Sequence, residues 1–446
     1  MADTFDLDAH LPPEPHGDSP RGEAKHDPSD YFGKEGLDLV RLIADVRARG
    51  PIARGIDGRL WHYGSGVWLP GGDDEVTRRV YALLGPRFRN SHLVNVHAVF
   101  RAGHQLIGGD PHHEYLNLVN GLLRWRTGEL EAHRPDVRST VQLPVMWNPE
   151  AVCPVIDEWL AEVIPDDAGD FIEELLGYLV LNGNPLHVAV LLLGAGRNGK
   201  GTLLRLVTAM LGHANVSSVP LQTLAENRFA AASLFGKLAN VCGDLDARML
   251  DRSDTFKMAT GGDTLYGEHK YGASFTFESW ATMLFSANQA PPSRDTSEGY
   301  YARWLVVPFT AHLTGRLRPQ AELDAELHAP AELEGLLARA VRGLQRLMAR
   351  GRFDPPPSVL AAGQEFRRTT DPVASFASEC LAIDPELHLP RTDVFDRYRT
   401  WCDDNGHRPL SASRFYDRIL GAVPGVSATK YAGERRLVGI GKGGEW

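Results

Sequence analysis

A nine-residue glycine-rich segment, from Gly194 to Thr202, constrains the fold of this chain more than any other part of the sequence. It reads Gly-Ala-Gly-Arg-Asn-Gly-Lys-Gly-Thr and follows an apolar run of the kind that forms a buried strand, residues 188–193. Apolar side chains then recur at the spacing of one helix face, at Leu203, Leu206, Val207 and Met210. The pattern predicts a strand, a tight turn and a helix. Such a turn directs backbone N–H groups toward a phosphate, and its glycines admit a close approach.

The segment has the Gly-x4-Gly-Lys spacing of a P-loop, which binds nucleoside triphosphates. Lys200 would place a positive charge at the β- and γ-phosphates. Gly201 occupies the position where a Mg²⁺-binding hydroxyl normally follows the lysine, so Thr202 is the candidate metal ligand. We expect ATP to contact the loop at Gly194, Gly196, Asn198, Gly199, Lys200, Gly201 and Thr202.

The same glycines fit the dinucleotide-binding pattern Gly-x-Gly-x-x-Gly, which is the competing interpretation. That pattern needs an acidic residue about 20 positions later to hold a ribose. No acid lies between Gly212 and Thr223, and the pattern leaves the lysine after the last glycine unexplained. We therefore favour a P-loop.

Three later apolar runs are flanked by polar residues. These residues are candidates to act on the nucleotide together with the loop. Asp244 and Asp246 follow the first run, where one carboxylate can hold Mg²⁺ and the other can orient the attacking water. A solvated acidic loop is the alternative for these two residues. Asn288 ends the second run and is suited to sensing the γ-phosphate. Arg303 precedes the third run, and from there it could reach the nucleotide of a neighbouring subunit.

The composition and charge pattern narrow the class of protein. The 446 residues carry a net charge of −10, and no apolar run approaches the roughly 18 residues that span a membrane. With no export signal at the start, we expect a cytoplasmic protein, in a bacterial host cytosol. The cysteines contain no Cys-x-x-Cys pair, which argues against a zinc ribbon or a disulfide framework. Residues 405–446 carry a net charge of +4, so a polyanion could dock there.

Changes in composition and in the pattern of apolar residues along the sequence predict four parts and a linker. Residues 1–30 are acidic and proline-rich, and we expect a disordered tail. Residues 31–170 predict a mixed α/β domain, and residues 171–350 predict an α/β ATPase domain with a largely parallel sheet. A proline run marks a linker at residues 351–371. Residues 372–446 read as three helices followed by a hairpin, which suits a winged-helix DNA-binding domain.

Taken in order, these motifs resemble the phage- and plasmid-encoded primase-helicase family related to the poxvirus primase-helicase. The matching motor residues are Gly194–Thr202, Lys257 with Gly261-Gly262-Asp263, Glu268-His269-Lys270-Tyr271, Asn288 with Pro291, and Arg303 before Phe309. Matches outside the motor are Asn120-Gly121, Thr127-Gly128, Pro135 and Cys153-Pro154 towards the N-terminus, and Phe376, Tyr398, Trp401-Cys402 and Gly406 towards the C-terminus.

The resemblance implies a superfamily three helicase motor of the AAA+ class that assembles into a ring, commonly a hexamer, with ATP and Mg²⁺ at subunit interfaces. It also implies a channel hairpin whose tip is His269-Lys270, and residues 264–277 do read as two short β segments. In the winged-helix part, Arg414 and Arg418 are the candidate DNA contacts.

We therefore expect an ATP-dependent, ring-forming DNA helicase of a phage, prophage or plasmid replication system that translocates on single-stranded DNA and unwinds duplex DNA. A non-translocating replication initiator that uses ATP as an assembly switch is the alternative, and a DNA-packaging ATPase is weaker because it predicts no winged helix. Residues 244–246 superficially resemble a primase metal motif, but no catalytic primase domain fits in residues 1–170. A primase or replication protein would then be a separate partner.

Overall fold

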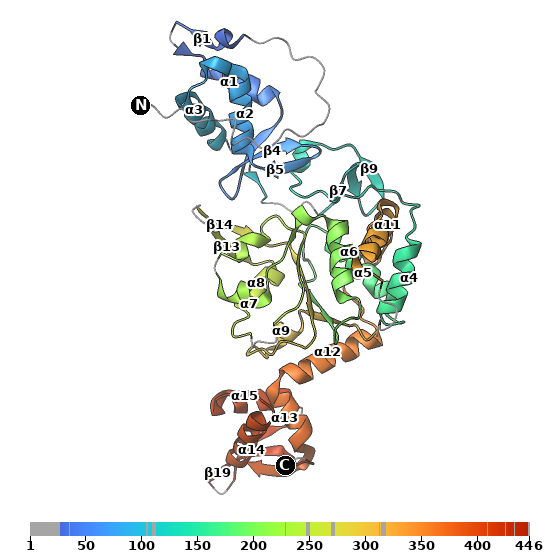
Figure 1. Cartoon of the computed structure of the whole chain (residues 1–446). Coiled ribbons are helices and arrows are strands. Elements are labelled where there is room, and N and C mark those ends of the chain that lie inside the picture. Colours follow the sequence, from blue (N-terminus) through green and yellow to red (C-terminus); the bar gives the residue numbers. More distant parts are fainter. Residues whose placement is uncertain are drawn as a thin grey trace.

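The computed structural model describes residues 27–446 apart from residues 35, 104–105, 109–112, 228, 247–249, 269–272, 312, 314–317, 408, 424, 432 and 445–446. The predicted acidic tail and the His269-Lys270 tip of the hairpin fall outside the described residues. Figure 1 shows an elongated arrangement, with the N-terminal elements at one end, the large sheet in the middle and the C-terminal helices at the other end. None of the described helices is long and apolar enough to cross a membrane.

The N-terminal elements surround a small four-stranded sheet, ordered β5-β4-β3-β6. Their apolar core is separate from that of the large sheet and includes Leu42, Val46, Val80 and Phe100. The elements are β1 (Phe32–Gly33), β2 (Gly36–Leu37), α1 (Leu39–Ala48), β3 (Ile52–Gly55), β4 (Leu60–Gly64), β5 (Val67–Pro70), α2 (Gly72–Leu84), α3 (Asn90–Arg101) and β6 (Leu106–Ile107). β4 and β5 form an antiparallel hairpin, and α1 buries Leu42, Ile43 and Val46 on one face.

A three-stranded sheet and two helices lead into the central sheet. They are β7 (Tyr115–Leu118), β8 (Gly121–Arg124), β9 (Glu129–Glu131), α4 (Pro154–Val163) and α5 (Gly169–Val180). One continuous core joins their apolar side chains to those of the central sheet, for example Leu160 to Val190. The predicted boundary between residues 170 and 171 therefore falls inside a continuous core.

The central sheet has five parallel strands in the order β11-β12-β15-β10-β16. The mixed α/β fold with a parallel sheet agrees with the sequence prediction. The elements of this region are β10 (Ala189–Leu193), α6 (Lys200–Leu211), β11 (Val216–Ser217), α7 (Leu221–Glu226), β12 (Ala239–Cys242), α8 (Asp254–Gly261), β13 (Thr264–Glu268), β14 (Ser274–Glu278), β15 (Thr282–Ala287), α9 (Glu298–Tyr301), β16 (Trp304–Pro308), α10 (Gln320–Leu327) and α11 (Pro330–Arg350).

Alternate residues of β10 enter two different cores, because side chains alternate across a strand. Val190 and Leu192 belong to the core that contains α5, α6 and α11, whereas Ala189 and Leu191 belong to the core that contains α7 and α8. Both faces of the strand are covered, which explains its uninterrupted apolar sequence. The sheet is thus a rigid platform for the residues at the ends of its strands.

The antiparallel hairpin β13–β14 was expected from the sequence and is present beside the sheet. Phe275 and Phe277 of β14 lie against Phe235, with ring centroids 5.2 and 5.4 Å apart. Phe235 also makes an edge contact with Trp61 of β4, with ring centroids 6.4 Å apart. The ring of Phe235 therefore contacts both the hairpin and the N-terminal sheet.

The C-terminal region contains α12 (Pro357–Thr370), α13 (Pro372–Cys380), β17 (Leu381–Pro390), α14 (Arg391–Asp404), α15 (Ala412–Ala422), β18 (Ser427–Tyr431) and β19 (Glu434–Lys442). The three predicted helices and the terminal hairpin are present, and β17 adds a third strand beside β19. The predicted linker, residues 351–371, is largely helical. Pro357 begins α12 at a position that tolerates proline, and the buried Phe366 of this helix packs against Trp304 of β16.

Candidate functional site

A cavity of about 800 Å³ lies at the edge of the central sheet where β10, β12 and β15 end. This is the edge at which ligands bind in open parallel sheets. The glycine-rich loop and the start of α6 form one wall, and residues that follow β12 and β15 form another. The lining includes Gly196, Lys200, Thr202, Arg205, Asp244, Ser286 and Asn288.

The glycine-rich loop is held open in a shape that suits an anion. Gly196, Arg197 and Gly199 have positive φ values of 75, 48 and 93°, respectively. Within the described chain, no backbone N–H group from residue 197 to residue 202 donates to a backbone carbonyl. These donors lie at the N-terminus of α6, where the helix dipole favours negative charge. The loop can therefore accept a phosphate without breaking other backbone bonds.

Glycine is required at both ends of this loop for steric reasons. A Cβ atom on Gly194 would overlap the carbonyl oxygen of Phe309, and one on Gly199 would lie 2.8 Å from Cγ1 of Val163. Asn198 closes the loop from inside, because its buried side chain donates from Nδ2 to the Phe309 carbonyl oxygen at 2.7 Å. Its side chain thus has a structural contact, while its backbone N–H remains available.

The ammonium group of Lys200 points into the loop and is mostly buried. Its Nζ atom donates to Oδ1 of Asn198 at 3.0 Å and to Oδ1 of Asn288 at 3.4 Å. Burial lowers the pKa of Lys200, and the nearby negative charge of Asp244 opposes that shift. The acceptors around Nζ are carbonyl and amide oxygens, so an incoming phosphate would be its strongest partner.

Thr202 lies in the cavity wall, and its hydroxyl oxygen is engaged by a cation. Oγ1 of Thr202 accepts from Nη2 of Arg205 at 3.1 Å, and Nε of Arg205 also pairs with Oδ2 of Asp324 at 2.9 Å. A Mg²⁺ ion would have to replace the guanidinium at this oxygen. The role of Thr202 as a metal ligand stays a prediction.

The two aspartates after β12 differ in position. Asp244 lines the cavity, is exposed and has a left-handed φ of 50°, and its N–H donates to Oγ of Ser286 at 3.3 Å. Asp246 is also exposed but does not line the cavity, and its carbonyl oxygen accepts from the Gln222 side chain. The structure therefore brings Lys200, Asp244 and Asn288 together and leaves Asp246 to one side.

Arg303 lies at the amino-terminal end of β16, whereas the glycine-rich loop follows the carboxyl-terminal end of β10. β16 runs parallel to β10 with Trp304 beside Ala189, so the length of the five-residue strand β10 separates the two sites. At about 3.3 Å per residue this is roughly 16 Å. The Arg303 side chain donates from Nε to Oγ1 of Thr260 at 3.0 Å and also to the Gly299 carbonyl. Arg303 therefore does not reach the cavity of its own chain.

Four residues of α4 line the cavity, and the sequence analysis did not find them. They are Val155, Glu158, Trp159 and Glu162. Leu313, Arg318, Gln320 and Leu323, which follow the sheet, complete the lining. None of these positions carries a motif, because only tertiary packing brings α4 over the loop.

The two arginines predicted to bind DNA have different surroundings. Arg414 of α15 is exposed. Arg418, one turn later, donates from Nε and from Nη2 to Oδ2 of Asp371, and the Asp371 side chain is fully buried. The charge of Arg418 is used inside the fold, and a DNA contact by Arg418 stays a prediction.

Comparisons with known proteins match three separate segments of the chain. The family described as "D5 N terminal like" matches residues 72–165, and the family described as "Poxvirus D5 protein-like" matches residues 368–425. A family of unknown function (DUF5906) matches residues 192–303, the segment that contains the loop, Asp244, Asn288 and Arg303.

Two viral proteins are similar in sequence. "Putative helicase 022R" of Frog virus 3 (isolate Goorha) is 25% identical over 277 residues, which cover 55% of this chain and 28% of the viral protein. "Putative helicase L207/L206" of Acanthamoeba polyphaga mimivirus is 26% identical over 274 residues, 56% of this chain and 28% of the viral protein. The chain thus spans less than a third of the length of the curated relatives it matches.

Solved structures of the NrS-1 C-terminal region share the fold. The apo structure of residues 305–718 has a TM-score of 0.55 at 14% identity and covers 91% of this chain and 99% of that chain. The A form apo structure has a TM-score of 0.52 at 13% identity. The two D5 matches and the viral relatives support a primase-helicase-like family, and the NrS-1 structures show that the fold is shared. The segment that matches the D5 N terminal like family includes α4, so this segment supplies one wall of the cavity.

Proposed function

We propose that the protein is an ATP-dependent DNA helicase with a P-loop motor of the superfamily three AAA+ class. The observation that carries the proposal is the cavity at the carboxyl ends of three parallel strands, where Lys200, Asp244 and Asn288 meet the N-terminus of α6. The order β11-β12-β15-β10-β16 places a strand between the loop strand and the aspartate strand, as in AAA+ motors. The helicase names of the viral relatives support the same activity.

In this proposal the loop binds the phosphates of ATP, and residues that follow the strands act on the γ-phosphate. The free N–H groups of residues 197–202 and the Lys200 ammonium would bind the β- and γ-phosphates. Asn288, whose oxygen now accepts from Lys200, would turn its amide to the γ-phosphate. Asp246 would orient the attacking water after a rearrangement that brings it to the cavity. Charge that develops in the transition state is then stabilised by groups already in position.

The oxygen donors in the cavity fit Mg²⁺, which keeps several waters and takes few protein ligands. Asp244 would hold the ion through water, and Thr202 would offer its hydroxyl after release from Arg205. The described residues contain no group of three or more His, Cys, Asp or Glu that could hold a metal on its own. When bound with the nucleotide, the ion would neutralise phosphate charge.

In this proposal the arginine that acts on the terminal phosphate comes from another subunit. Arg303 lies a strand length away from its own loop, at the edge a neighbouring subunit could meet. We propose a ring, commonly a hexamer, in which Arg303 of one subunit contacts the γ-phosphate bound by the next. The hairpin β13–β14, with its His269-Lys270 tip, would line the channel and contact single-stranded DNA. The C-terminal helices and the β18–β19 hairpin would act as a winged helix on duplex DNA, with Arg414 as a contact.

Turnover separates this proposal from a nucleotide-switched replication initiator. The full chain should hydrolyse ATP in the presence of Mg²⁺, faster with single-stranded DNA, and should unwind a forked duplex. Mass photometry with ATP should show an assembly several times the 49.1 kDa chain. ATP binding and assembly without steady-state turnover would favour the switch instead. A replication system of a phage, prophage or plasmid, with a separate primase, is the setting that we propose for this motor.

A further inference from the structure

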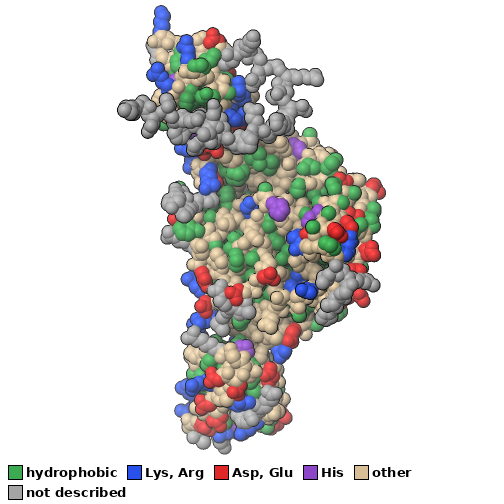
Figure 2. Space-filling model, in the orientation of Figure 1, with side chains coloured by type: hydrophobic (Ala, Val, Ile, Leu, Met, Phe, Trp, Pro, Cys, Tyr) green, Lys and Arg blue, Asp and Glu red, His purple; other side chains and the backbone are tan. Residues whose placement is uncertain are grey.

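The N-terminal elements carry a second candidate binding surface, remote in sequence from the cavity. Residues 31–107 contain eleven basic and seven acidic side chains, a net charge of +4 in a chain whose net charge is −10. Residues 76–107 contain five arginines and no acid. Figure 2 shows Lys and Arg side chains beside apolar ones on this part of the molecule, at the top of the view.

Rings and guanidinium groups lie close together where β1, the turn after α2 and the start of α3 meet. Arg87 lies over the ring of Phe32, with Cζ 5.3 Å from the ring centroid, and Phe32 is 5.7 Å from the ring of His92. Arg89 is close enough to His92 that its charge, added to the effect of burial, lowers the pKa of the imidazole. These four residues join the turn after α2 and the start of α3 to β1.

Two further rings lie next to these residues in the sequence, Tyr81 on α2 and Phe88 in the turn that follows α2. Phe88 directly follows Arg87, and its ring makes an edge contact with Tyr81 at 5.6 Å. We call Phe32, Tyr81, Arg87, Phe88, Arg89 and His92 the aromatic–arginine strip.

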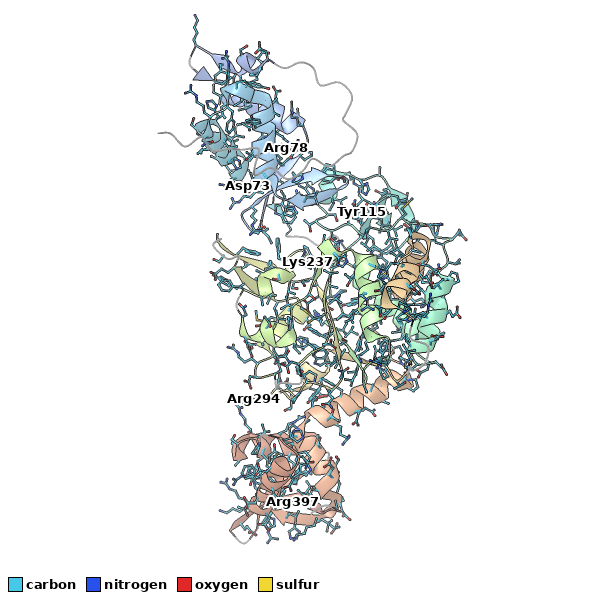
Figure 3. All side chains as sticks on the ribbon, in the orientation of Figure 1. Asp73, Arg78, Tyr115, Lys237, Arg294 and Arg397 are labelled. Carbon is cyan, nitrogen blue, oxygen red and sulfur yellow. The ribbon has the colours of Figure 1, made fainter. Side chains whose placement is uncertain are left out.

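Tyr81 and the two arginines of the strip are accessible to solvent, whereas Phe32, Phe88 and His92 are half-buried. Half of the Tyr81 surface is exposed, and both Arg87 and Arg89 are exposed. Neither arginine forms an ion pair within the part of the chain that the structure describes. Two other arginines of the N-terminal elements do form ion pairs. Arg78 of α2 pairs with Glu75 at 2.8 Å, and Arg41 of α1 pairs with Asp30 at 3.7 Å. Arg78 is labelled on α2 in Figure 3.

We infer that the aromatic–arginine strip binds single-stranded DNA. The two arginines would contact backbone phosphates, and the exposed face of Tyr81, with the edge of Phe88, would stack on unpaired bases. Arginines that lie near an exposed aromatic ring are features of a site that follows a single strand without reading its sequence. A duplex keeps its bases stacked on one another and would use only the arginines.

This site goes beyond the proposed helicase function, because it needs neither nucleotide nor the hairpin tip. Arg87 and Arg89 stand about a hundred residues before the glycine-rich loop and do not line the cavity. A DNA-binding site on the N-terminal elements would contact the single-stranded DNA before it enters the channel or after it leaves.

Binding of a fluorescent oligothymidine of about 20 nucleotides to the full chain, without ATP, tests the inference. The double variant Arg87→Gln/Arg89→Gln should bind at least about tenfold more weakly at low salt. The slope of log affinity against log salt should fall by about 1.4, since each phosphate contact on a single strand contributes about 0.7. The control Arg41→Gln/Arg78→Gln removes the same charge from the same elements, where both arginines have acidic partners, and should bind nearly as the natural protein does.

Tyr81→Ser tests stacking separately from charge. It should weaken binding of the oligothymidine about fivefold or more, leave the salt slope unchanged and leave duplex binding unchanged. Photocrosslinking with iodouridine DNA should attach to the peptide that contains Tyr81 and Phe88. Basal ATP turnover should be normal in all variants, so a failed ATPase assay would count against the proposed motor and not against this site.

Four results would overturn the inference. Three of them are a loss of affinity in the Arg87/Arg89 variant no larger than in the control, an unchanged affinity in Tyr81→Ser, and crosslinks that map only outside residues 76–107. The fourth is an equal loss for single strand and duplex in Tyr81→Ser, which would mean that Tyr81 does not stack on unpaired bases. Thermal unfolding of each variant should match the natural protein, because all substituted side chains are exposed.

Discussion

Nζ of Lys200 lies 3.0 Å from Oδ1 of Asn198, and Nδ2 of the same asparagine donates to the carbonyl oxygen of Phe309 at 2.7 Å. One buried amide thus holds both the lysine and the end of β16. The partners of the Lys200 ammonium group are uncharged oxygens. A variant without the lysine therefore leaves no unpaired charge in the loop, and the loop should keep its shape.

Lys200→Ala should lower ATP turnover by about a hundredfold or more while keeping the cooperative unfolding transition. In the proposed motor the lysine would stabilise phosphate charge in the transition state, an effect of about 10²–10³ in rate. A steady-state ATPase assay and thermal unfolding check the two parts. Loss of the cooperative transition would show that Lys200 is a structural residue.

Arg303→Ala should bind ATP with near-normal affinity and hydrolyse it slowly, since the arginine would act only on the transition state of a neighbour. Mixing this variant with Lys200→Ala should restore part of the turnover. At some interfaces the Lys200→Ala subunit would offer its arginine to an intact loop. The mixing ratio is scanned under conditions of subunit exchange, and no recovery at any ratio would contradict action in trans.

Thr202→Val and Arg205→Gln should shift the Mg²⁺ requirement for turnover in opposite directions. The valine would remove the proposed metal ligand and should raise the half-maximal Mg²⁺ concentration. The glutamine removes the guanidinium that competes for the same oxygen and should lower it. Turnover measured across a Mg²⁺ titration gives both values. Shifts in the same direction, or none, would move the metal ligand away from Thr202.

Arg418→Ala should destabilise the C-terminal helices by about 3–5 kcal/mol, because it leaves the carboxylate of Asp371 buried and unpaired. Asp371 also caps α13 by accepting from the N–H groups of Val373 and Ala374. Arg414→Ala, one turn away and exposed, should change stability by less than about 0.5 kcal/mol and weaken duplex DNA binding. Chemical denaturation of both variants makes the comparison, and equal stability would contradict the structural role of Arg418.

Asp295→Asn should destabilise the protein at pH 7 by about 2 kcal/mol. The difference should begin to shrink only below about pH 4 and should continue to fall as the solution is made more acidic. Burial alone would raise the pKa of Asp295, but hydrogen bonds from Lys257, Ser253 and Ser297 outweigh it and hold the pKa well below its usual range. A carboxyl whose folded pKa is depressed contributes stability above its unfolded value, about 3.9, and loses it as the pH falls through the folded value.

Denaturation of the natural protein and Asp295→Asn at several pH values measures this contribution. Asp254→Asn is the control, since its ion pair with Arg252 is largely exposed and should contribute less than about 1 kcal/mol. A stability difference for Asp295→Asn that does not shrink in acid would contradict the assignment.

The sequence predicted the parts of the site that lie in local motifs. The loop from Gly194, the position of Asp244 after a strand and the amide of Asn288 were found because parallel strands end at one edge of a sheet. The β13–β14 hairpin was found because its residues alternate. These features depend on neighbours along the chain.

The features that escaped prediction depend on neighbours in space. Trp159 and Glu162 of α4 line the cavity only because α4 packs over the loop, which no pattern in residues 154–163 indicates. The proline run before α12 was interpreted as a break, although Pro357 can begin a helix. The pair of Arg418 with Asp371 joins residues 47 positions apart, so a count of positive charge could not separate it from Arg414.

The ring of Phe235 has one further consequence. It touches Phe275 and Phe277 of the hairpin on one side and Trp61 of the N-terminal sheet on the other, and its Cζ would be 2.7 Å from a Cβ on Gly108. A close-packed contact of this kind does not compress, so displacement of β14 must displace either the ring or the strand that carries Trp61. If the hairpin moves during ATP turnover as proposed, the contacts of Phe235 would transmit that movement to the N-terminal elements.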